Sequence, residues 1–380
     1  MTRASGLAAA SAGVAVLAAS VACSSGGPGV DPAPGPSSSP SSTATSPRNP
    51  GRADPLTIAL AGDVHFEGAL ERRLDRPAMA LAPAAATLAA ADVAILNLET
   101  SLGSGGRPEP GKRYPFQAPP AALTALAAAG IDVASMANNH ALDYGRAPLP
   151  STFDAIEKAK LADPPLAVVG FGRDVDEAFR PARTEVAGTV VATIGATVAD
   201  QDPTADPTGQ WAATADSAGT ADALQPARLL AAVRQAARSA DVVVVYMHWG
   251  VQGESCPSGA QRSLAADLVE AGGDIVVGSH THVLQGDGRL GAGYVAYGLG
   301  NYAWYTQSSE TTPATGVLTL TVRPPVSPDG RASVVDAEWE GASIGADGLP
   351  TPLAGAAASG FDTDVRALRA CAGLTPPASR

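Results

Sequence analysis

Residues 56–65 read LTIALAGDVH and give the clearest indication of the fold. Leu56–Ala61 is an apolar run that is typical of a strand buried in a sheet. Asp63 and His65 follow at the point where this strand is expected to end. Because sites in α/β sheets form at the carboxyl ends of strands, the segment predicts a sheet and a site at its edge.

The same pattern continues along the chain, where short apolar runs alternate with Ala- and Leu-rich stretches typical of helices. The further strands expected are Val93–Leu98, Val133–Met136, Leu166–Gly170, Thr189–Ile194, Val242–Met247, Ile275–Val277, Tyr294–Tyr297, Val317–Val322 and one around Ala337–Trp339. The helices expected are Ala84–Ala91, Pro119–Ala129, Leu149–Ala159, Ala221–Ser239, Ser258–Ala271 and a short one near Asp364–Ala370. Residues 199–220 are expected to form a surface loop or lid. The alternation predicts a layered α/β domain.

The chain contains five histidines, and each lies beside another ligand-type residue at an expected strand end. The polar residues at these ends are Asp63 and His65, Glu99, Asn139 and His140, His248, and His280 and His282. Imidazole binds transition metals well, and strand ends bring distant parts of a chain together. These positions therefore predict one convergent metal site.

A two-metal hydrolase needs several protein ligands for each ion and an open position for water and substrate. Glu99 is expected to bridge the ions, and Asn139 offers a neutral oxygen. The spacing of His280 and His282 makes both side chains point the same way from an extended segment. The set contains no cysteine, which excludes a structural zinc–thiolate site and favours Mn, Fe or Zn held by nitrogen and oxygen ligands.

Six motifs occur together over about residues 56–305. They are GDVH (62–65), NLE (97–99), ANNHALDYG (137–145), HWG (248–250), GSHTHVLQ (278–285) and GLGNY (298–302). As a set they resemble the CapA family, the bacterial capsule-synthesis or poly-γ-glutamate-associated proteins related to calcineurin-like metallophosphoesterases. The resemblance implies a metallophosphoesterase-like layered α/β sandwich, in which two mixed sheets are flanked by helices.

The resemblance also implies a role for each matching residue. One metal ion would be bound by Asp63, His65, Glu99 and His282, and the other by Glu99, Asn139, His248 and His280. His140 resembles the histidine that protonates the leaving group, and Asp143 would orient its ring. The chain departs from the pattern at Thr281, where the family commonly has Pro, and at Glu99, where phosphoesterases use Asp. His65 stands where many CapA-like proteins have Met, which makes this chain more like a working metallophosphoesterase.

Two further residues are candidates for substrate binding. Arg113 lies in the loop after Glu99, where it either holds an anionic substrate or is a solvated surface arginine. Asn301 lies in a Gly-rich segment that is expected to approach the site closely.

The first 23 residues are typical of an export signal, with Arg3 before an apolar run that is too short to span a bilayer comfortably. Cys23 is expected to carry a lipid, although residues 20–22 also suit an ordinary signal peptidase, which would give a secreted protein. Residues 24–54 are rich in Ser, Pro and Gly and are expected to form a disordered tether. A CapA-like domain is expected over residues 55–322, with residues 323–380 as an extension packed on the same domain.

The charge of the chain limits the classes of partner that it can bind. The net charge is −12 without a basic run, which argues against binding to nucleic acid.

Besides Cys23 the chain has Cys256 and Cys371, which form either one disulfide in an oxidising compartment or two free thiols. The sequence leaves both open.

We therefore expect an extracytoplasmic, lipid-anchored hydrolase with two divalent transition-metal ions. Metal-bound hydroxide would attack a phosphoester or related bond in an anionic envelope or capsule polymer or its precursor. The expected partners are that polymer, the outer leaflet of the cytoplasmic membrane and a capsule-synthesis complex. Two alternatives stay open, namely cleavage or transfer of a γ-glutamyl amide in poly-γ-glutamate, and a noncatalytic accessory that binds the polymer.

Overall fold

The computed structural model describes residues 54–198, 206, 208–304, 313–327 and 330–377. The expected export signal and Cys23 lie outside these residues, as does the tether apart from Asp54. No helix in the described ranges combines the length and the apolar character that crossing a membrane requires.

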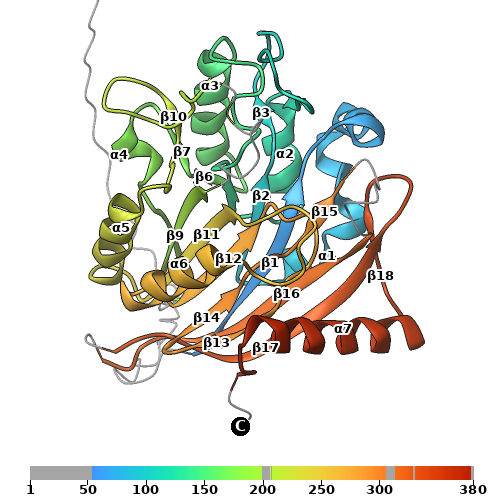
Figure 1. Cartoon of the computed structure of the whole chain (residues 1–380). Coiled ribbons are helices and arrows are strands. Elements are labelled where there is room, and N and C mark those ends of the chain that lie inside the picture. Colours follow the sequence, from blue (N-terminus) through green and yellow to red (C-terminus); the bar gives the residue numbers. More distant parts are fainter. Residues whose placement is uncertain (1–53, 199–205, 207, 305–312, 328–329, 378–380) are drawn as a thin grey trace, which may run out of the picture. The chain divides into compact units, whose positions relative to one another are not determined.

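Two mixed sheets form the centre of the molecule (Figure 1). The first has eight strands in the order β18-β17-β16-β1-β2-β5-β6, with β15 also paired to β1. Its strands are β1 (Leu56–Val64), β2 (Val93–Leu98), β5 (Val133–Ser135), β6 (Ala167–Val169), β15 (Asn301–Ala303), β16 (Ala314–Arg323), β17 (Ser333–Ile344) and β18 (Pro350–Pro352). The strands β1, β2, β5 and β6 run parallel, whereas β16, β17 and β18 are antiparallel additions.

The second sheet has six strands in the order β13-β14-β12-β11-β9-β8. They are β8 (Ala182–Val186), β9 (Thr189–Val198), β11 (Val242–Trp249), β12 (Ile275–Ser279), β13 (Asp287–Leu290) and β14 (Gly293–Ala296). Its central strands are parallel and its two edge strands are antiparallel. Two short ladders pair β3 (Ser101–Leu102) with β4 (Gln117–Ala118) and β7 (Phe171–Gly172) with β10 (Gly219–Thr220).

Alternation of side chains along the strands builds the layers. In β11, Val244 and Tyr246 point into the cluster between the two sheets, where they join Ile58 and Leu60 of β1. The intervening Val243 and the other odd-numbered side chains of β11 face helices instead. The Tyr246 hydroxyl donates a hydrogen bond of 2.7 Å to the Ala61 carbonyl, which ties the second sheet to the first.

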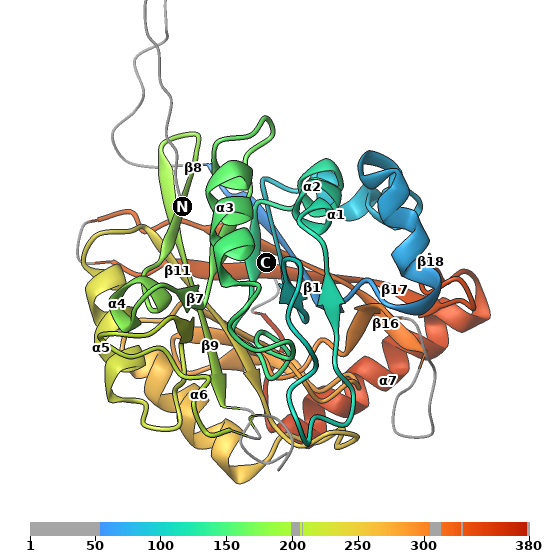
Figure 2. The ribbon, with the colours of Figure 1, turned by 90° about the horizontal axis from the view of Figure 1, so that it is seen from above.

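Helices cover the outer faces of both sheets (Figure 2). The first sheet is covered by α1 (Ala86–Ala90), α2 (Ala121–Ala128) and α3 (Leu149–Lys160), and the second by α5 (Ala227–Ala237) and α6 (Gly259–Glu270). Short 3₁₀ segments lie at Gly68–Asp75, Pro77–Met79 and Ala82–Ala84, and α4 (Val175–Ala178) adds a single turn. The expected layered α/β sandwich of two mixed sheets flanked by helices is thus confirmed.

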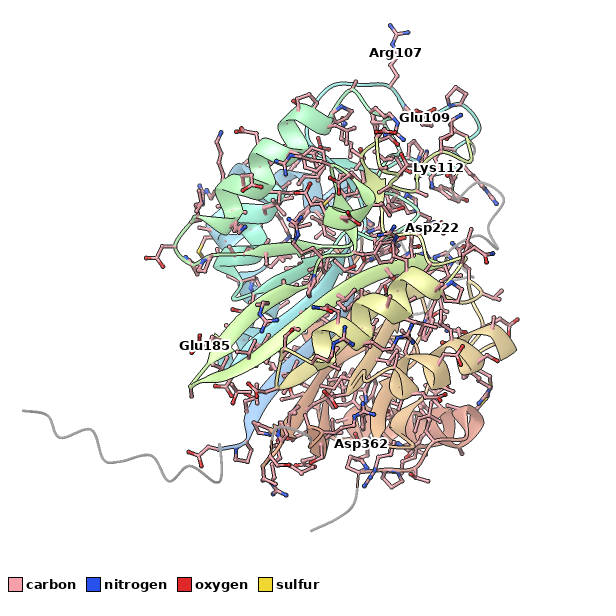
Figure 3. All side chains as sticks on the ribbon, turned by 90° about the vertical axis from the view of Figure 1, so that its left-hand side faces the viewer. Arg107, Glu109, Lys112, Glu185, Asp222 and Asp362 are labelled. Carbon is pink, nitrogen blue, oxygen red and sulfur yellow. A yellow bond between two sulfur atoms is a disulfide. The ribbon has the colours of Figure 1, made fainter. Side chains whose placement is uncertain are left out.

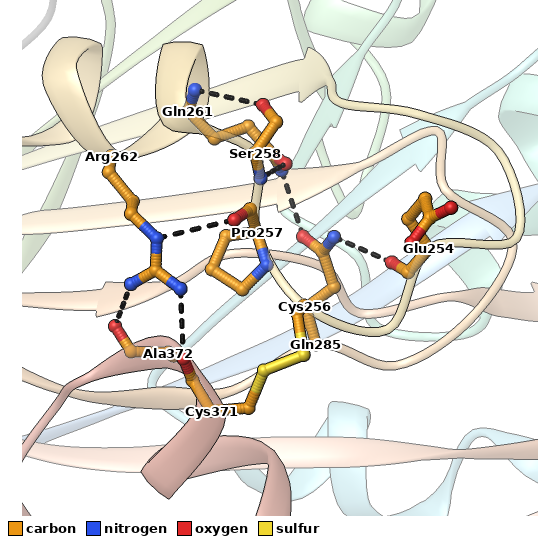
Figure 4. The surroundings of a disulfide bond; sticks show 9 residues. All are labelled: Glu254, Cys256, Pro257, Ser258, Gln261, Arg262, Gln285, Cys371 and Ala372. Carbon is orange, nitrogen blue, oxygen red and sulfur yellow. Dashed lines mark hydrogen bonds between the residues drawn. A yellow bond between two sulfur atoms is a disulfide. The ribbon is translucent and has the colours of Figure 1, made fainter.

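The C-terminal helix α7 (Ala356–Ala372) lies along β13 and β17 and is joined to the loop after β11 by a disulfide between Cys256 and Cys371. Arg262 reinforces this junction, because its guanidinium donates to the carbonyl oxygens of Cys371, at 2.8 Å, and of Ala372 (Figure 4). The same loop is held by Gln285, whose amide donates to the Glu254 carbonyl at 2.7 Å. The disulfide therefore connects α7 to the loop that begins after Trp249, one residue beyond His248.

The strands and helices expected from the sequence are present, although their ends differ. The structure also contains strands that were not expected, such as β8 and β13. The helix expected at Ala221–Ser239 begins only at Ala227, after Pro226. The described part of residues 199–220 contains β10, which pairs with β7. The strand expected around Ala337–Trp339 is the 12-residue β17. The short helix expected near Asp364–Ala370 is the 17-residue α7. The domain boundaries drawn from the sequence stay a prediction.

Candidate metal centre

Strand ends from both sheets meet at one buried site. Asp63 is the next-to-last residue of β1, Glu99 directly follows β2, and His248 lies near the end of β11. Glu99 is fixed beside β1 because its amide donates to the Val64 carbonyl at 2.8 Å. The seven residues expected as ligands are all buried, namely Asp63, His65, Glu99, Asn139, His248, His280 and His282.

Close packing of two glycines lets the chain reach this arrangement. A Cβ atom on Gly62 would lie 1.9 Å from the carbonyl oxygen of Gly300, which is closer than any real contact. The approach allows Asp63 to donate its amide to that carbonyl at 2.9 Å. Gly62 is therefore required where β1 ends, because any side chain would push the Gly300 backbone away.

Two groups of side chains each offer three metal-binding atoms. Glu99, His248 and His280 form one group, and Asp63, Glu99 and His282 form the other. Within each group the ligand atoms lie no more than 4.8 Å from one another. Glu99 is the member that the two groups share, which is the position expected for a bridging carboxylate.

The Glu99 carboxylate provides the test of whether a metal fits. Both of its oxygens are buried, and neither accepts a hydrogen bond from any donor in the described part of the chain. Burial raises the pKa of Glu99 well above its usual range, and the nearby Asp63 carboxylate raises it further. Two buried carboxylates at close range require either a shared proton or a cation between them. With the histidine nitrogens around it, this donor set fits a divalent transition metal.

Asp63 and His248 are both oriented by neighbours that belong to neither ligand group. Asn97 donates through its side-chain amide to Asp63 Oδ1 at 2.8 Å and lies 3.3 Å from His248 Nδ1. Ser279 Oγ lies 3.1 Å from the same Nδ1. Burial lowers the pKa of His248 well below its usual range, and His280 lowers it further. A neutral imidazole held through Nδ1 presents Nε2 for metal binding.

The segment that carries His280 and His282 has an unusual backbone. His280 has φ 93° and His282 has φ 56°, in the left-handed region that non-glycine residues rarely adopt. The strain is offset by contacts: the His280 amide donates to Asp63 Oδ2 at 3.1 Å, and Thr281 accepts from Gly253 at 2.9 Å. Strained backbone of this kind occurs where surrounding structure fixes a functional geometry.

His65 and Asn139 stand beside these groups. Nδ1 of His65 accepts a hydrogen bond of 3.0 Å from the Glu67 amide, and its ring lies 4.1 Å from that of Trp304, between centroids. Burial lowers the pKa of His65 well below its usual range, and His140 contributes in the same direction. Asn139 Oδ1 lies 2.7 Å from His248 Nε2. Their assignment as metal ligands stays a prediction.

His140 lies next to the two groups with its ring held from two sides. Nδ1 is 2.6 Å from Asp143 Oδ2, and the ring stacks on Phe116 with 4.1 Å between centroids. Nε2 is 3.5 Å from Glu99 Oε1, so it faces the ligand groups. Burial raises the pKa of Asp143 to about 7, against the opposing charge of Lys112, whose Nζ lies 3.1 Å from Asp143 Oδ1. Sequence reasoning missed Lys112, which lies in a loop without a motif.

The two residues expected to bind substrate are placed differently. Arg113 is exposed, and its guanidinium lies 4.9 Å above the ring of Tyr114. Asn301 is buried, and its Oδ1 lies 2.8 Å from His282 Nδ1. Asn301 therefore orients a candidate ligand, and substrate contact by either residue stays a prediction.

Most of the chain, including the residues of the metal centre, is similar to a known protein family. Residues 57–305 match a family model described as "Bacterial capsule synthesis protein PGA_cap". The chain is 36% identical over 186 residues to the capsule biosynthesis protein CapA of Bacillus anthracis, a match that covers 48% of this chain and 42% of the relative. It is 30% identical over 199 residues to a probable polyglutamine synthesis accessory protein of Mycobacterium tuberculosis, with 51% of this chain and 50% of the relative covered. These matches thus span no more than half of the relatives' length.

Solved structures with a similar arrangement include a phosphatase from Mycoplasma pneumoniae and a 5′-nucleotidase, described as putative, from Staphylococcus aureus. The first has 12% identity and a TM-score of 0.46, and covers 76% of this chain and 94% of the phosphatase. The second has 16% identity and a TM-score of 0.42, and covers 83% of this chain and 58% of the nucleotidase. At these values the likeness carries no argument about activity.

Proposed function

The chain belongs to the family of bacterial capsule synthesis proteins, and from this membership and its metal centre we propose that it is a metal-dependent hydrolase. Its proposed substrate is a phosphoester or related bond in an anionic envelope or capsule polymer, or in a precursor of that polymer. The proposed cofactor is a pair of divalent transition-metal ions.

The Glu99 carboxylate is the observation that carries the proposal. It is 0% exposed, is shared by both ligand groups, and accepts no hydrogen bond from a described donor. Leaving a buried carboxylate in this state costs several kcal/mol in the absence of a compensating charge. A protein that needed the site only for structure would be more stable with an apolar side chain at this position.

The residues around the site support specific roles in hydrolysis. When bound, the metal ions supply Lewis-acid activation of water and of the ester oxygen. Asp63, Glu99, His248, His280 and His282 would hold the ions, while Asn97, Ser279 and Asn301 keep these ligands in orientation. His140 is held through Nδ1 by Asp143, so Nε2 is the atom that would give its proton to the leaving oxygen.

Replacing His140 by Ala tests this role. The variant should keep its metal, because His140 belongs to neither ligand group, and should lose about 10²–10⁴-fold in turnover. Turnover would be followed on a phosphodiester and metal by elemental analysis. Substantial loss of metal from the variant would instead make His140 a ligand and exclude the acid role.

We also propose that the protein lies outside the cytoplasm and is held at the membrane through a lipid on Cys23. The apolar N-terminal run that ends in Ala22-Cys23 supports this location. The disulfide between Cys256 and Cys371 agrees with an oxidising compartment. Cell fractionation of wild type and Cys23→Ala tests the anchor: the variant should move from the membrane to the soluble fraction, and a wild type that is already soluble would contradict it.

The names of two relatives support two alternative functions for this chain. The "PGA biosynthesis protein CapA" of Bacillus subtilis, 33% identical over 174 residues, favours a γ-glutamyl amide as the bond that is cleaved or transferred. The accessory protein of Mycobacterium tuberculosis favours a noncatalytic role in a capsule-synthesis complex. Incubation with phosphodiester and γ-glutamyl substrates distinguishes the proposed phosphoester hydrolase from the γ-glutamyl enzyme. Partner capture that survives Glu99→Ala, without turnover of either substrate, would favour the accessory.

A further inference from the structure

Lys112 is a buried cation that belongs to no ligand group. Its side chain is 1% exposed, although it lies in the loop between β3 and β4, where its neighbours Gly111 and Arg113 are exposed. Lysine is almost never fully buried unless it is paired. The contacts of its ammonium group therefore indicate what holds it there.

The contacts of the ammonium group include a carboxylate, a main-chain carbonyl and an aromatic ring. Nζ lies 3.1 Å from Asp143 Oδ1, and it donates a hydrogen bond to the main-chain oxygen of Asn139. It also lies 4.9 Å from the centre of the Trp211 ring, in the geometry of a cation–π contact. Lys112 thus touches the residue before His140 and the carboxylate that binds the His140 ring.

The Asp143 carboxylate has its two oxygens divided between different tasks. Oδ2 lies 2.6 Å from His140 Nδ1 and accepts from the Phe116 amide at 2.7 Å. Oδ1 faces Lys112. The rotation of this carboxylate about its side-chain bonds is therefore set by the ammonium group on one side and by the His140 ring on the other.

We propose that Lys112 is a positioning residue for His140, which acts by fixing the Asp143 carboxylate and the Asn139–Asp143 segment so that Nε2 faces the metal groups. The proposal rests on the proposed function only in the proton that His140 would transfer. A purely structural Lys112 would stabilise the loop without changing the His140 ring. The two accounts differ in what happens at the His140 Nδ1 proton.

The experiment therefore observes that proton by ¹⁵N-edited NMR of the full chain, treated with chelator so that the result is independent of metal loading. Lys112→Met removes the charge and keeps most of the stem, and Lys112→Arg keeps the charge. Arg107→Met is the matched control, because Arg107 lies in the same loop and extends away from the molecule (Figure 3). Circular dichroism checks that each variant is folded.

Wild type, Lys112→Arg and Arg107→Met should show a downfield Nδ1 proton, protected by its short bond to Asp143. In Lys112→Met the signal should exchange with water at least about 10-fold faster or disappear. An unchanged signal in folded Lys112→Met would overturn the proposal, even if its melting temperature fell. If Lys112→Met does not fold, Lys112→Gln, which keeps a donor for the Asn139 carbonyl, decides in the same way.

Turnover provides a second readout that separates this proposal from the proposed function. A positioned acid matters most when the leaving group is a poor one. Lys112→Met should therefore lose about 10-fold or more on an alkyl phosphodiester and much less on a nitrophenyl one. Equal losses on both would overturn the positioning role. A wild type without phosphodiester turnover would overturn the proposed function, while the NMR result still decides the role of Lys112.

Discussion

Removing the disulfide that joins α7 to the loop after His248 should destabilise the protein strongly while leaving the metal centre in place. The change is the double variant Cys256→Ser, Cys371→Ser. Both side chains are at least partly accessible, so serine can occupy either position without a buried hydroxyl. Other contacts still hold the helix, because Arg369 Nη2 lies 2.9 Å from Asp287 Oδ2 and Arg262 bonds the last helical carbonyls.

The magnitude follows from the length of chain that the disulfide closes. The two cysteines are 115 residues apart. A loop of that length restricts the unfolded chain by about 16 cal/mol/K, which corresponds to about 5 kcal/mol at room temperature. The folded state keeps its other contacts to α7. We therefore expect the loss of stability to come mainly from the greater conformational entropy of the unfolded chain without the disulfide. Measured values are often smaller than this model predicts, so a loss of about 3–5 kcal/mol is expected.

The assay is urea unfolding of wild type and the double variant, both with chelator, so that metal binding does not add to either free energy. Metal content after reloading is measured on the same two samples. A loss of stability below about 1 kcal/mol would refute the loop-entropy reasoning. Loss of metal from the folded double variant would show that the disulfide also fixes the site, through the bond from Gly253 to Thr281.

Three further predictions concern the site and its support. Gly62→Ala should destabilise the protein by about 3 kcal/mol in urea unfolding, since its Cβ would lie 1.9 Å from the Gly300 oxygen. Gly259→Ala is the control and should be neutral or stabilising, because a Cβ there would have no atom within 4 Å. Asn301→Ala should weaken metal binding by about 10–100-fold in competition titrations, because it frees the His282 ring; unchanged affinity would remove Asn301 from the site. In metal-free protein, Asp143 has its pKa raised from 3.8 to about 7, so the folded state keeps a proton that the unfolded chain releases, and stability should fall as pH rises through that window. Asp143→Asn should lessen this slope by at most about 1.4 kcal/mol per pH unit, and an identical slope would contradict the shift.

Most of the fold could be predicted because its strands are strongly apolar. A run such as Val242–Met247 identifies a strand buried on both faces, and the structure confirms it as the greater part of β11, which continues to Trp249. The antiparallel edge was harder to predict. In β17 charged and apolar residues alternate on a half-exposed strand, so Ser333–Ile344 lacks the continuous apolar run that marks the central strands.

The candidate ligands could be predicted for a different reason. Parallel strands bring their carboxyl ends together, so a polar residue such as Glu99 directly after an apolar run indicates the site without any knowledge of contacts. Lys112 offers no such signal. Its burial depends on Asp143 and Trp211, which come from other segments of the chain. From the sequence alone, the neighbouring Arg113 is an equally good candidate for a basic residue at the site. Partners that meet only through tertiary packing leave no periodic pattern in a chain.

The proposed binuclear metal centre can be tested by measuring the metal content of the purified protein. Elemental analysis of wild type should give about two equivalents of transition metal, and Glu99→Gln, which keeps the shape of the bridging residue but not its charge, should lose most of it. Arg107→Met, on the exposed loop, should retain the wild-type content. No metal in wild type after supplementation, or full retention of metal in Glu99→Gln, would contradict a metal centre bridged by Glu99.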